Sequence, residues 1–233
     1  VRNGTLTDKL RTDDCTRRVL LRHLYAASLG PPVRPVKLLI GSGLETEWGI
    51  TKEQRQKIDK LPDVKFVTIE NPFKKGDKVL DCPVPGIDTA ISHVQYASPD
   101  GTCRIIGDEF HDVDIAVAAK KTIVTCEQII SDEQIRRDPT LNSIPVFCVD
   151  AVVLAPFGAH PSQCSSLYDY DKAYYKAYDV ASKTEEDFKT FVDEWVYGVK
   201  DHEEYINKLG ASRLAKLQVI PGLGYAVDMT KEG

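Results

Sequence analysis

The sequence lacks a long apolar run, and it also lacks an excess of positive charge. No stretch approaches the ~20 apolar residues that a membrane-spanning helix needs, and residues 1–10 contain no secretory hydrophobic segment. Lysine and arginine total 30 against 35 for aspartate and glutamate, which gives a net charge of -5. Nucleic-acid binding needs a clustered basic face. We therefore expect a cytoplasmic protein that binds neither membrane nor nucleic acid.

Closely spaced cysteine pairs are missing as well. The six cysteines lie far apart, with no Cys-x-x-Cys pair, and they are Cys15, Cys82, Cys103, Cys126, Cys148 and Cys164. Four of them lie inside or beside apolar runs, which is typical of buried free thiols in a reducing compartment. The five histidines show no metal-ligand spacing. We therefore expect free thiols rather than a disulfide framework, and no metal site.

The sequence does contain an alternation of strand-like and helix-like segments. The apolar, strand-like runs are 33–40, 64–69, 79–84 and 144–154. A capping box of Thr51 and Gln54 starts a short helix that ends before Pro62. With 42% hydrophobic and 28% charged residues, a chain of 233 residues can form one sizeable core. We predict a single α/β domain, 1–233, with an open mixed or mostly parallel sheet, helices on both faces and further C-terminal helices.

The segment 90–130 is predicted as strand, turn, strand, helix and strand. Ser98-Pro99-Asp100-Gly101 has the composition of a tight turn, with Pro at the second position and Gly at the fourth. Asp112 or Asp114 is expected to cap a helix that docks closely on a sheet. The narrow face of that helix consists of Ile115, Ala118 and Ala119. Residues 122–126 are predicted to form a buried strand.

Tyrosine is concentrated in the segment 165–210, which we predict to be a tyrosine-rich arm with helices. Five of the ten tyrosines are Tyr168, Tyr170, Tyr174, Tyr175 and Tyr178. Because tyrosine combines a large contact area with a polar tip, this segment is either an interface or a surface arm that packs on itself. Two helices are expected after these tyrosines, one capped by Thr184 and one that begins at Asp201 and closes at Gly210.

The order of residues in 90–130 resembles the A (alpha) subunit of family I coenzyme A transferases, closest to the members that act on glutaconate. Further blocks carry the same resemblance: Gly41-Ser42-Gly43-Leu44, Glu47-Trp48-Gly49, Asn71-Pro72-Phe73, 148–156, 158–164 and 221–225. Together they cover the chain from about Leu29 to its end. Family members begin with a strand and a Gly-rich loop. Since this chain opens at Val1 with a charged, helix-like stretch, we expect that an N-terminal segment is absent from it.

The resemblance implies a division of labour between two subunits. Family I enzymes move coenzyme A (CoA) between an acyl-CoA and a carboxylate by a ping-pong route through a glutamyl-CoA intermediate. The nucleophilic glutamate belongs to a Ser-Glu-Asn-Gly motif of the B subunit, which does not occur in this sequence. We therefore expect no catalytic residue in this chain, a partner B subunit, CoA thioesters as substrates and no bound cofactor. The implied acids are dicarboxylates such as glutaconate or 2-hydroxyglutarate, in glutamate fermentation.

Two alternatives remain open. A relative of the same fold hydrolyses a CoA thioester or opens a CoA-linked ring, and it needs no acceptor acid. The second alternative, from another class, is a non-catalytic structural subunit.

The resemblance also implies where substrate binds. Gly41, Ser42 and Gly43 are expected to form a wall of the substrate site, because ligands of open α/β sheets bind beyond the carboxyl ends of strands and glycines let the backbone approach them. From the residues alone, a plain strand-to-helix turn is the alternative. Gln95 and the turn at residues 160–163 are expected to face the same cleft.

Three lone acids are predicted to be structural rather than catalytic, namely Glu70, Glu109 and Glu127. Glu70-Asn71 copies two letters of the B-subunit motif, but Pro72 stands where the motif has glycine. Proline supplies no backbone N–H for an oxyanion.

Overall fold

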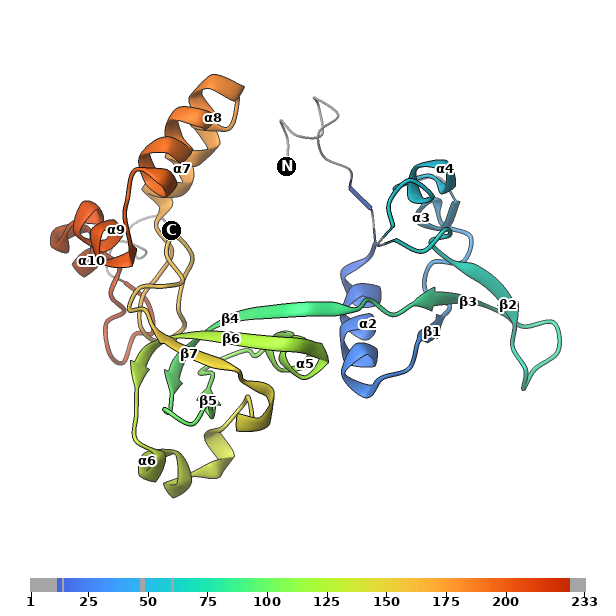
Figure 1. Ribbon diagram of the computed structural model, residues 1–233, viewed down its shortest axis with the longest axis horizontal. Helices are drawn as coiled ribbons and strands as arrows, with labels where there is room; N and C mark the ends of the chain where they lie inside the picture. The colour runs from blue at the N-terminus through green and yellow to red at the C-terminus, as the bar shows by residue number, and fades with distance from the viewer. Residues whose placement is uncertain (1–11, 14, 47–48, 60, 227–233) are drawn as a thin grey trace. The chain divides into compact units, whose positions relative to one another are not determined.

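The computed structural model describes residues 12–13, 15–46, 49–59 and 61–226, and it divides the chain into two compact units (Figure 1). Unit 1 comprises Val1–Ala90 and His111–Lys120, and unit 2 comprises Ile91–Phe110 and Lys121–Gly233. None of the helices that the structure describes is long and apolar enough to span a membrane. That residues 1–233 act as one domain stays a prediction.

Unit 1 packs helices on a small antiparallel sheet. The sheet has the order β1-β3-β2, with β1 at Val33–Val36, β2 at Val67–Glu70 and β3 at Lys78–Pro83. Its helices are α2 (Arg17–Leu29), α3 (Gly43–Thr46), α4 (Lys52–Arg55) and α5 (Asp112–Ala118). The buried core consists of Val19, Val36, Leu39, Leu80 and Cys82.

The predicted elements of unit 1 are present, with changed ends. The run 33–40 forms a strand only to Val36, because the chain then turns and buries Leu39 in the core. The capping box of Thr51 and Gln54 is confirmed in both directions. The predicted caps of α5 are wrong. His111 takes the N-cap position without a side-chain bond. The two aspartates lie in the first turn, where the positive end of the helix dipole stabilises their negative charge.

Unit 2 contains a mixed sheet of order β5-β4-β6-β7. Its strands are β4 (Ile87–Ala97), β5 (Cys103–Arg104), β6 (Ala119–Ile129) and β7 (Ala151–Leu154). β4 and β5 are antiparallel, whereas β6 and β7 are parallel. The predicted turn at Ser98–Gly101 joins β4 to β5 and is closed by a 3.0 Å bond from the Gly101 N–H to the Ser98 carbonyl. The α/β class predicted from the sequence is confirmed.

The run 144–154 is a strand only over β7. Short 3₁₀ turns at Pro139–Leu141 and Val146–Cys148 and the helix α6 (Asp132–Arg137) precede it. Ile144, which precedes β7, bridges to Cys103 of β5 and is fully buried.

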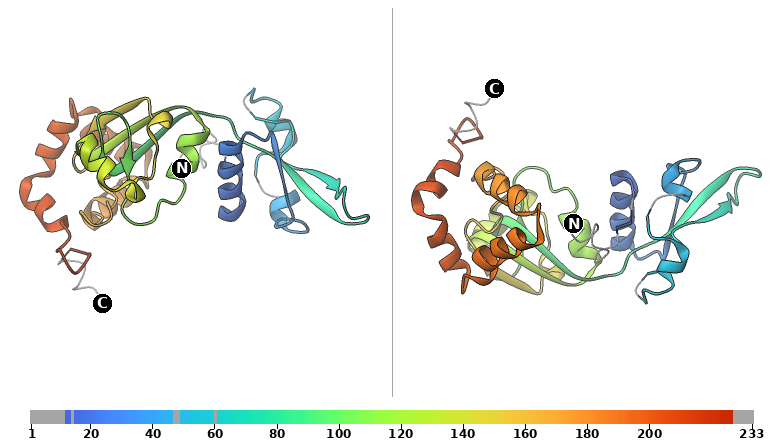
Figure 2. Two further views of the ribbon diagram at one scale, coloured as in Figure 1. Left: turned by 90° about the horizontal axis from the view of Figure 1, so that it is seen from below. Right: turned by 90° about the horizontal axis from the view of Figure 1, so that it is seen from above.

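The C-terminal part of unit 2 is helical. Its elements are α7 (Lys172–Ala181), α8 (Glu185–Val192), a π-helical turn (Asp193–Tyr197), α9 (His202–Leu209) and α10 (Ala211–Leu217). The predicted caps of α8 and α9 are confirmed, because Thr184 and Asp201 each accept a backbone N–H of the first turn. Figure 1 shows α8 at the end of this helical part that lies away from the strands, and Figure 2 gives two further views of it. Tyr174, Leu209 and Leu214 form their buried core.

All six cysteines are free thiols, as predicted. Four of them are buried, namely Cys82, Cys103, Cys126 and Cys164.

Candidate functional site

The Gly41-Ser42-Gly43 loop lies in unit 1 and leads into α3. Gly41 has a φ of 76°, in the left-handed region that glycine tolerates best. Its N–H donates to Glu45 Oε2 at 2.7 Å, and the Ser42 hydroxyl donates to the Leu39 carbonyl at 2.7 Å. The loop is therefore held by its own contacts. Because the preceding strand β1 belongs to an antiparallel sheet, the argument from the carboxyl ends of parallel strands does not apply here, and a substrate-binding role stays a prediction.

Gln95 lies on β4 in unit 2 and is buried. Its amide nitrogen donates to the carbonyls of Ile106 and Ser165, each at 3.1 Å, and its amide oxygen accepts the Ile106 N–H at 2.9 Å. These three bonds tie the strand to two loops. The nitrogen and the oxygen of the Gln95 amide are thus both hydrogen-bonded within the protein. Gln95 belongs to unit 2, whereas the Gly41–Gly43 loop belongs to unit 1.

A largely buried polar network starts at His93, which lies two residues before Gln95 on the same strand. His93 Nε2 donates to Glu127 Oε1 on β6 at 2.6 Å, and His93 Nδ1 lies 2.8 Å from Thr125 Oγ1. Glu127 also accepts the Tyr168 hydroxyl at 2.6 Å and the Phe157 N–H at 2.8 Å. Burial alone would raise the pKa of Glu127, but these three donors together lower it. Glu127 is therefore an ionised carboxylate, and its three hydrogen-bond donors all belong to this chain. This agrees with its predicted structural role.

Cys164 adds a third possible metal ligand to this network. Ligand atoms of His93, Glu127 and Cys164 lie within 4.8 Å of one another. A metal needs Cys as a thiolate, whereas burial raises the pKa of the Cys164 thiol to about 12. Glu127 already accepts three hydrogen bonds. The residues therefore fit a hydrogen-bonded core better than a metal centre.

The turn after β7 is shaped to fit against His93. Phe157 has a φ of 58°, and its ring packs on Tyr168 with centroids 4.7 Å apart. At Gly158 a side chain would begin 2.8 Å from His93 Cε1 and 2.7 Å from the Ala155 carbonyl oxygen, so only glycine fits there. The Tyr168 hydroxyl accepts the Ala159 N–H at 3.0 Å and so links this turn to Glu127.

His160 begins a second buried polar cluster. Its Nε2 lies 3.1 Å from Asp171 Oδ2 and its Nδ1 lies 2.6 Å from the Tyr205 hydroxyl. Burial lowers the pKa of His160, so the ring is neutral near pH 7. The carboxylate can only accept, and Nε2–H therefore donates to Asp171 while Nδ1 accepts from Tyr205. Arg213 donates to the same carboxylate oxygen.

Asp171 holds this cluster together. It is the N-cap of α7 and accepts the Tyr174 N–H at 2.9 Å through its other oxygen. Burial would raise the pKa of Asp171, but the bonds from Arg213, Tyr174 and His160 outweigh it and lower the pKa to about 2. One charged carboxylate therefore joins the 160–163 turn, α7 and α10.

A pocket of 680 Å³ borders Asp171 in unit 2. Its basic lining residues are Lys172, Lys176, Arg213 and Lys216. The 160–163 turn takes no part in the lining. Ser162 instead bonds through its hydroxyl to the Tyr175 hydroxyl at 2.7 Å, and Gln163 is exposed.

The tyrosine side chains of the segment 165–210 fall into a buried group and an exposed group. Tyr168 and Tyr174 are buried and belong to the polar clusters, whereas Tyr175 and Tyr178 are each 41% exposed. The structure therefore places part of this segment in the core, and its use as an interface stays a prediction. Of the remaining acids, Glu109 is exposed, and Glu70 ends β2 with Oε1 accepting the Gly76 N–H at 2.7 Å.

Comparison with known proteins identifies the class to which this architecture belongs. No protein-family model matches the chain. It is 63% identical to the A subunit of glutaconate CoA-transferase from Acidaminococcus fermentans, over 96% of this chain and 70% of that protein. The crystal structure of glutaconate coenzyme A-transferase from the same organism superposes with a TM-score of 0.94 at 61% identity, covering 99% of this chain and 73% of that one. The chain belongs to the family of coenzyme A transferase A subunits.

More distant relatives widen the range of chemistries. The A subunit of a 3-oxoadipate CoA-transferase from Pseudomonas knackmussii is 30% identical over 65% of this chain and 52% of that protein. The IpdA subunit of a cholesterol ring-cleaving hydrolase from Rhodococcus jostii is 26% identical over 76% of this chain and 58% of that protein. The resemblance to CoA-transferase A subunits inferred from the sequence is confirmed, and the chain is a subunit of a transferase.

Proposed function

We propose that this chain is the A subunit of a heteromeric enzyme that exchanges coenzyme A between an acyl-CoA, such as acetyl-CoA, and a dicarboxylate. The dicarboxylate is glutaconate or 2-hydroxyglutarate, in a pathway that ferments glutamate in the cytoplasm. The observation that carries this proposal is the 63% identity to a glutaconate CoA-transferase A subunit over 96% of the chain. The catalytic glutamate is supplied by a B subunit.

The hydrogen bonds that Glu127 and Glu70 accept support a nucleophile in the partner subunit and not in this chain. A carboxylate that attacks a thioester needs an unshielded lone pair, and hydrogen bonds to the charged form lower its nucleophilicity along with its pKa. Glu127 accepts three hydrogen bonds in a buried site, and Glu70 braces a hairpin loop. The sequence contains no Ser-Glu-Asn-Gly motif.

The proposed reaction is a ping-pong exchange. The B-subunit carboxylate attacks the carbonyl carbon of the donor thioester, and the CoA thiolate leaves as an enzyme-bound mixed anhydride forms. The thiolate then attacks the glutamyl carbonyl, which releases the donor acid as a carboxylate and leaves glutamyl-CoA. The acceptor carboxylate repeats these steps in reverse. Each attack builds charge on a tetrahedral oxygen, which backbone N–H groups can stabilise.

The part of this chain in that reaction is to complete the substrate site. We assign Gly41, Ser42 and Gly43 to one wall of it, because glycine without a side chain permits close approach of a ligand to the backbone. Gln95 acts in our proposal by holding β4 to the Ile106 and Ser165 loops, since its amide is bonded to both. It is a positioning residue.

Mixing the subunits tests the proposal. The chain alone should not transfer CoA from glutaryl-CoA to acetate, and activity should appear when a B subunit is added. Hydroxylamine or borohydride trapping with donor thioester should modify a glutamate of the B subunit. Glu70→Gln in the heteromer should reduce kcat by much less than the roughly 10²-fold or more that loss of a covalent nucleophile causes. Transfer by this chain alone, or a modified Glu70 peptide, would refute the proposal.

A hydrolytic or ring-opening activity is the second candidate, and the 26% identity to the ring-cleaving hydrolase subunit favours it over a purely structural role. The two activities differ in their need for an acceptor. A hydrolase consumes the thioester and releases free CoA without acetate, whereas the transferase consumes it only when an acceptor acid is present. Thiol release measured with and without acetate separates them.

A further inference from the structure

The 680 Å³ pocket of unit 2 carries more positive than negative charge. Its charged lining residues are four cations and two acids, namely Lys172, Lys176, Arg213 and Lys216 against Asp169 and Asp171. The difference amounts to two positive charges. Sites for small molecules usually have volumes of about 300–1,000 Å³, so the pocket has room for a ligand much larger than a single inorganic ion. Size and charge together favour an organic anion.

The two acids of the pocket are held by protein donors. Asp171 is bonded through both of its oxygens, and its charge is balanced by Arg213. Oδ2 of Asp169 accepts the Ala226 N–H. Oδ1 of Asp169 accepts no bond from a described residue, so it can accept one from a ligand. The acids therefore leave the excess of positive charge in place and add one hydrogen-bond acceptor.

Arg213 is oriented by the protein before any ligand binds. Its Nε donates to Asp171, and its Cζ lies 5.8 Å from the centroid of the Tyr174 ring. The two Nη groups carry the other four of its five N–H donors, and they bond to no described residue. The planar fork of an arginine matches two oxygens of a phosphate or a carboxylate. Arg213 is therefore a preorganised donor for an oxyanion.

Like charges lie next to each other on both helices that line the pocket. Lys172 and Lys176 are four residues apart on α7, and Arg213 and Lys216 are three residues apart on α10. Residues at these spacings are neighbours on the surface of a helix, and like charges there destabilise it. An anion in the pocket relieves the repulsion in both helices at once.

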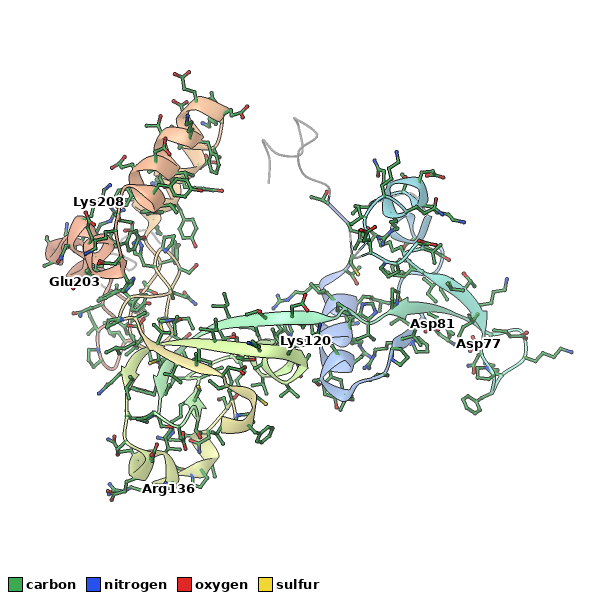
Figure 3. The ribbon with its side chains drawn as sticks, in the orientation of Figure 1. Asp77, Asp81, Lys120, Arg136, Glu203 and Lys208 are labelled. Atoms are coloured by element: carbon green, nitrogen blue, oxygen red, sulfur yellow. The ribbon has the colours of Figure 1, made fainter. Side chains whose placement is uncertain are left out.

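Two of the lysines have no counter-ion in the described part of the chain. Lys176 and Lys216 are exposed, and neither bonds to a described acid. Lys208 on α9, which is labelled in Figure 3, shows a different use of a lysine in this helical region. Its Nζ donates to the Glu194 carbonyl at 2.6 Å and lies 4.7 Å from the centroid of the Trp195 ring. Lys176 and Lys216 are thus available to a ligand.

The rest of the lining is largely apolar. It includes Tyr170, Ala173, Leu209, Leu217 and Ala226. Apolar and aromatic walls with a few convergent polar groups are typical of sites for organic ligands. A bare inorganic phosphate gains nothing from such walls, whereas the base and sugar of a nucleotide cover them.

We propose that this pocket binds a nucleotide through its phosphate groups. Arg213 donates to two phosphate oxygens, and Lys176 and Lys216 balance the remaining charge. Oδ1 of Asp169 accepts a ribose hydroxyl, as carboxylates do in dinucleotide sites. The nucleotide is either the 3′-phosphorylated ADP end of CoA or a free nucleotide. Only the first of these sources rests on the proposed function.

Calorimetry with the purified chain tests the site. Two probes separate the sources, because adenosine 3′,5′-bisphosphate copies the nucleotide end of CoA and ADP represents a free nucleotide. We expect at least one of them to bind, and we expect no binding of adenosine, which has no phosphate. Tighter binding of the bisphosphate assigns the pocket to CoA, whereas tighter binding of ADP assigns it to a free nucleotide.

Substitutions in the lining should weaken this binding. Lys176→Gln with Lys216→Gln should raise Kd about 10-fold and make it less dependent on salt, because two charges beside the phosphates are removed. The melting temperature should not fall, since neither lysine has a partner among the described residues. Arg213→Lys keeps a positive charge beside Asp171 but loses the planar fork, and it should also raise Kd about 10-fold. Should Arg213→Lys unfold, the lysine pair still decides the question.

The matched control is Lys183→Gln with Lys189→Gln, because both lysines are exposed in unit 2 and lie outside the lining. This control should leave Kd unchanged, and equal weakening by the two double variants would overturn the site in favour of a general attraction to positive surface. The proposal also fails if neither nucleotide binds, if adenosine binds as tightly as ADP, or if the dicarboxylate glutarate binds more tightly than either nucleotide. The test needs neither a B subunit nor turnover, so any of these results leaves the proposed function standing.

Discussion

His93 on β4 and Glu127 on β6 are joined by a hydrogen bond of 2.6 Å between Nε2 and Oε1, and the side chains are only 14% and 10% exposed. Two strands of one sheet thus share a largely buried polar contact, and the Tyr168 hydroxyl and the Phe157 N–H add two more bonds to Glu127. This contact fixes the turn that follows β7 and, through Tyr168, the start of the tyrosine-rich segment.

We expect Glu127→Gln to destabilise unit 2 markedly. The amide keeps the size of the carboxylate, but one of its two ends is a donor and cannot accept from His93, Tyr168 or Phe157. Leaving a buried polar group unsatisfied costs about 1–3 kcal/mol. Urea unfolding checks this value. Glu109→Gln is the control, because Glu109 is exposed, and it should change the free energy of unfolding by at most about 0.5 kcal/mol. Equal effects of the two substitutions would contradict the network.

A methyl group at position 158 should be poorly tolerated. In Gly158→Ala the new Cβ would lie 2.7 Å from the Ala155 carbonyl oxygen and 2.8 Å from His93 Cε1, so the turn or the imidazole has to move. Overpacking of this kind costs about 1–3 kcal/mol. The matched control is Gly86→Ala, where nothing lies within 4 Å of the added Cβ. Thermal unfolding should separate the two variants, and similar melting temperatures would show that His93 is not held tightly.

The lowered pKa of Asp171 predicts how the free energy of unfolding changes at acid pH. Its pKa is about 2 in the folded chain against a usual value of 3.8, so its stabilisation is fully present above about pH 4 and is lost as the pH falls toward 2. Unfolding free energies of the unaltered chain and Asp171→Asn should therefore differ most above pH 4. The difference should shrink by about 2 kcal/mol between pH 4 and pH 2. Asp63→Asn is the control, because Asp63 is exposed. If the difference in unfolding free energy between the unaltered chain and Asp171→Asn does not depend on pH, the carboxylate is not its cause.

Ser42→Val distinguishes a wall of the substrate site from a plain turn. The substitution removes the hydroxyl that donates to Leu39 and adds two methyl groups beside Gly41 and Gly43. If the loop lines the site, a displacement of about 1 Å in the substrate lowers kcat/KM on the order of 10²-fold. If the loop is only a turn, the melting temperature falls slightly and kcat/KM stays unchanged. Steady-state kinetics of the reconstituted heteromer with a dicarboxylyl-CoA decide between the two.

The sequence predicted the elements that depend on neighbouring residues. The capping box at Thr51, the caps at Thr184 and Asp201 and the turn at Ser98–Gly101 are all in place, because each depends on bonds that span only three or four residues. Strand ends were predicted less well. The strand at 33–40 stops at Val36 because Leu39 is needed in the core, which an apolar run cannot reveal.

The buried polar clusters were not predicted, because their members are far apart in the chain. His93 and Glu127 are 34 residues apart, and Arg213 and Asp171 are 42 apart. A local signal was nevertheless present on two of the strands. His93 and Gln95 are two residues apart on β4, and so are Thr125 and Glu127 on β6, each within an apolar run. Polar side chains on one face of a buried strand need partners, so this spacing indicated a network without identifying its members.

The Asp171 carboxylate has three partners, His160, the Tyr174 N–H and Arg213, and these are synthesised at different times. Residue 160 leaves the ribosome before Asp171 and residue 174 soon after it, but Arg213 follows only when α10 is made. Until then a carboxylate destined for the interior has no cation beside it, and a buried unpaired charge is expensive. The helical half of unit 2 therefore reaches its final packing only after α10 has been made, and a chain that stops before Arg213 should be more sensitive to proteases.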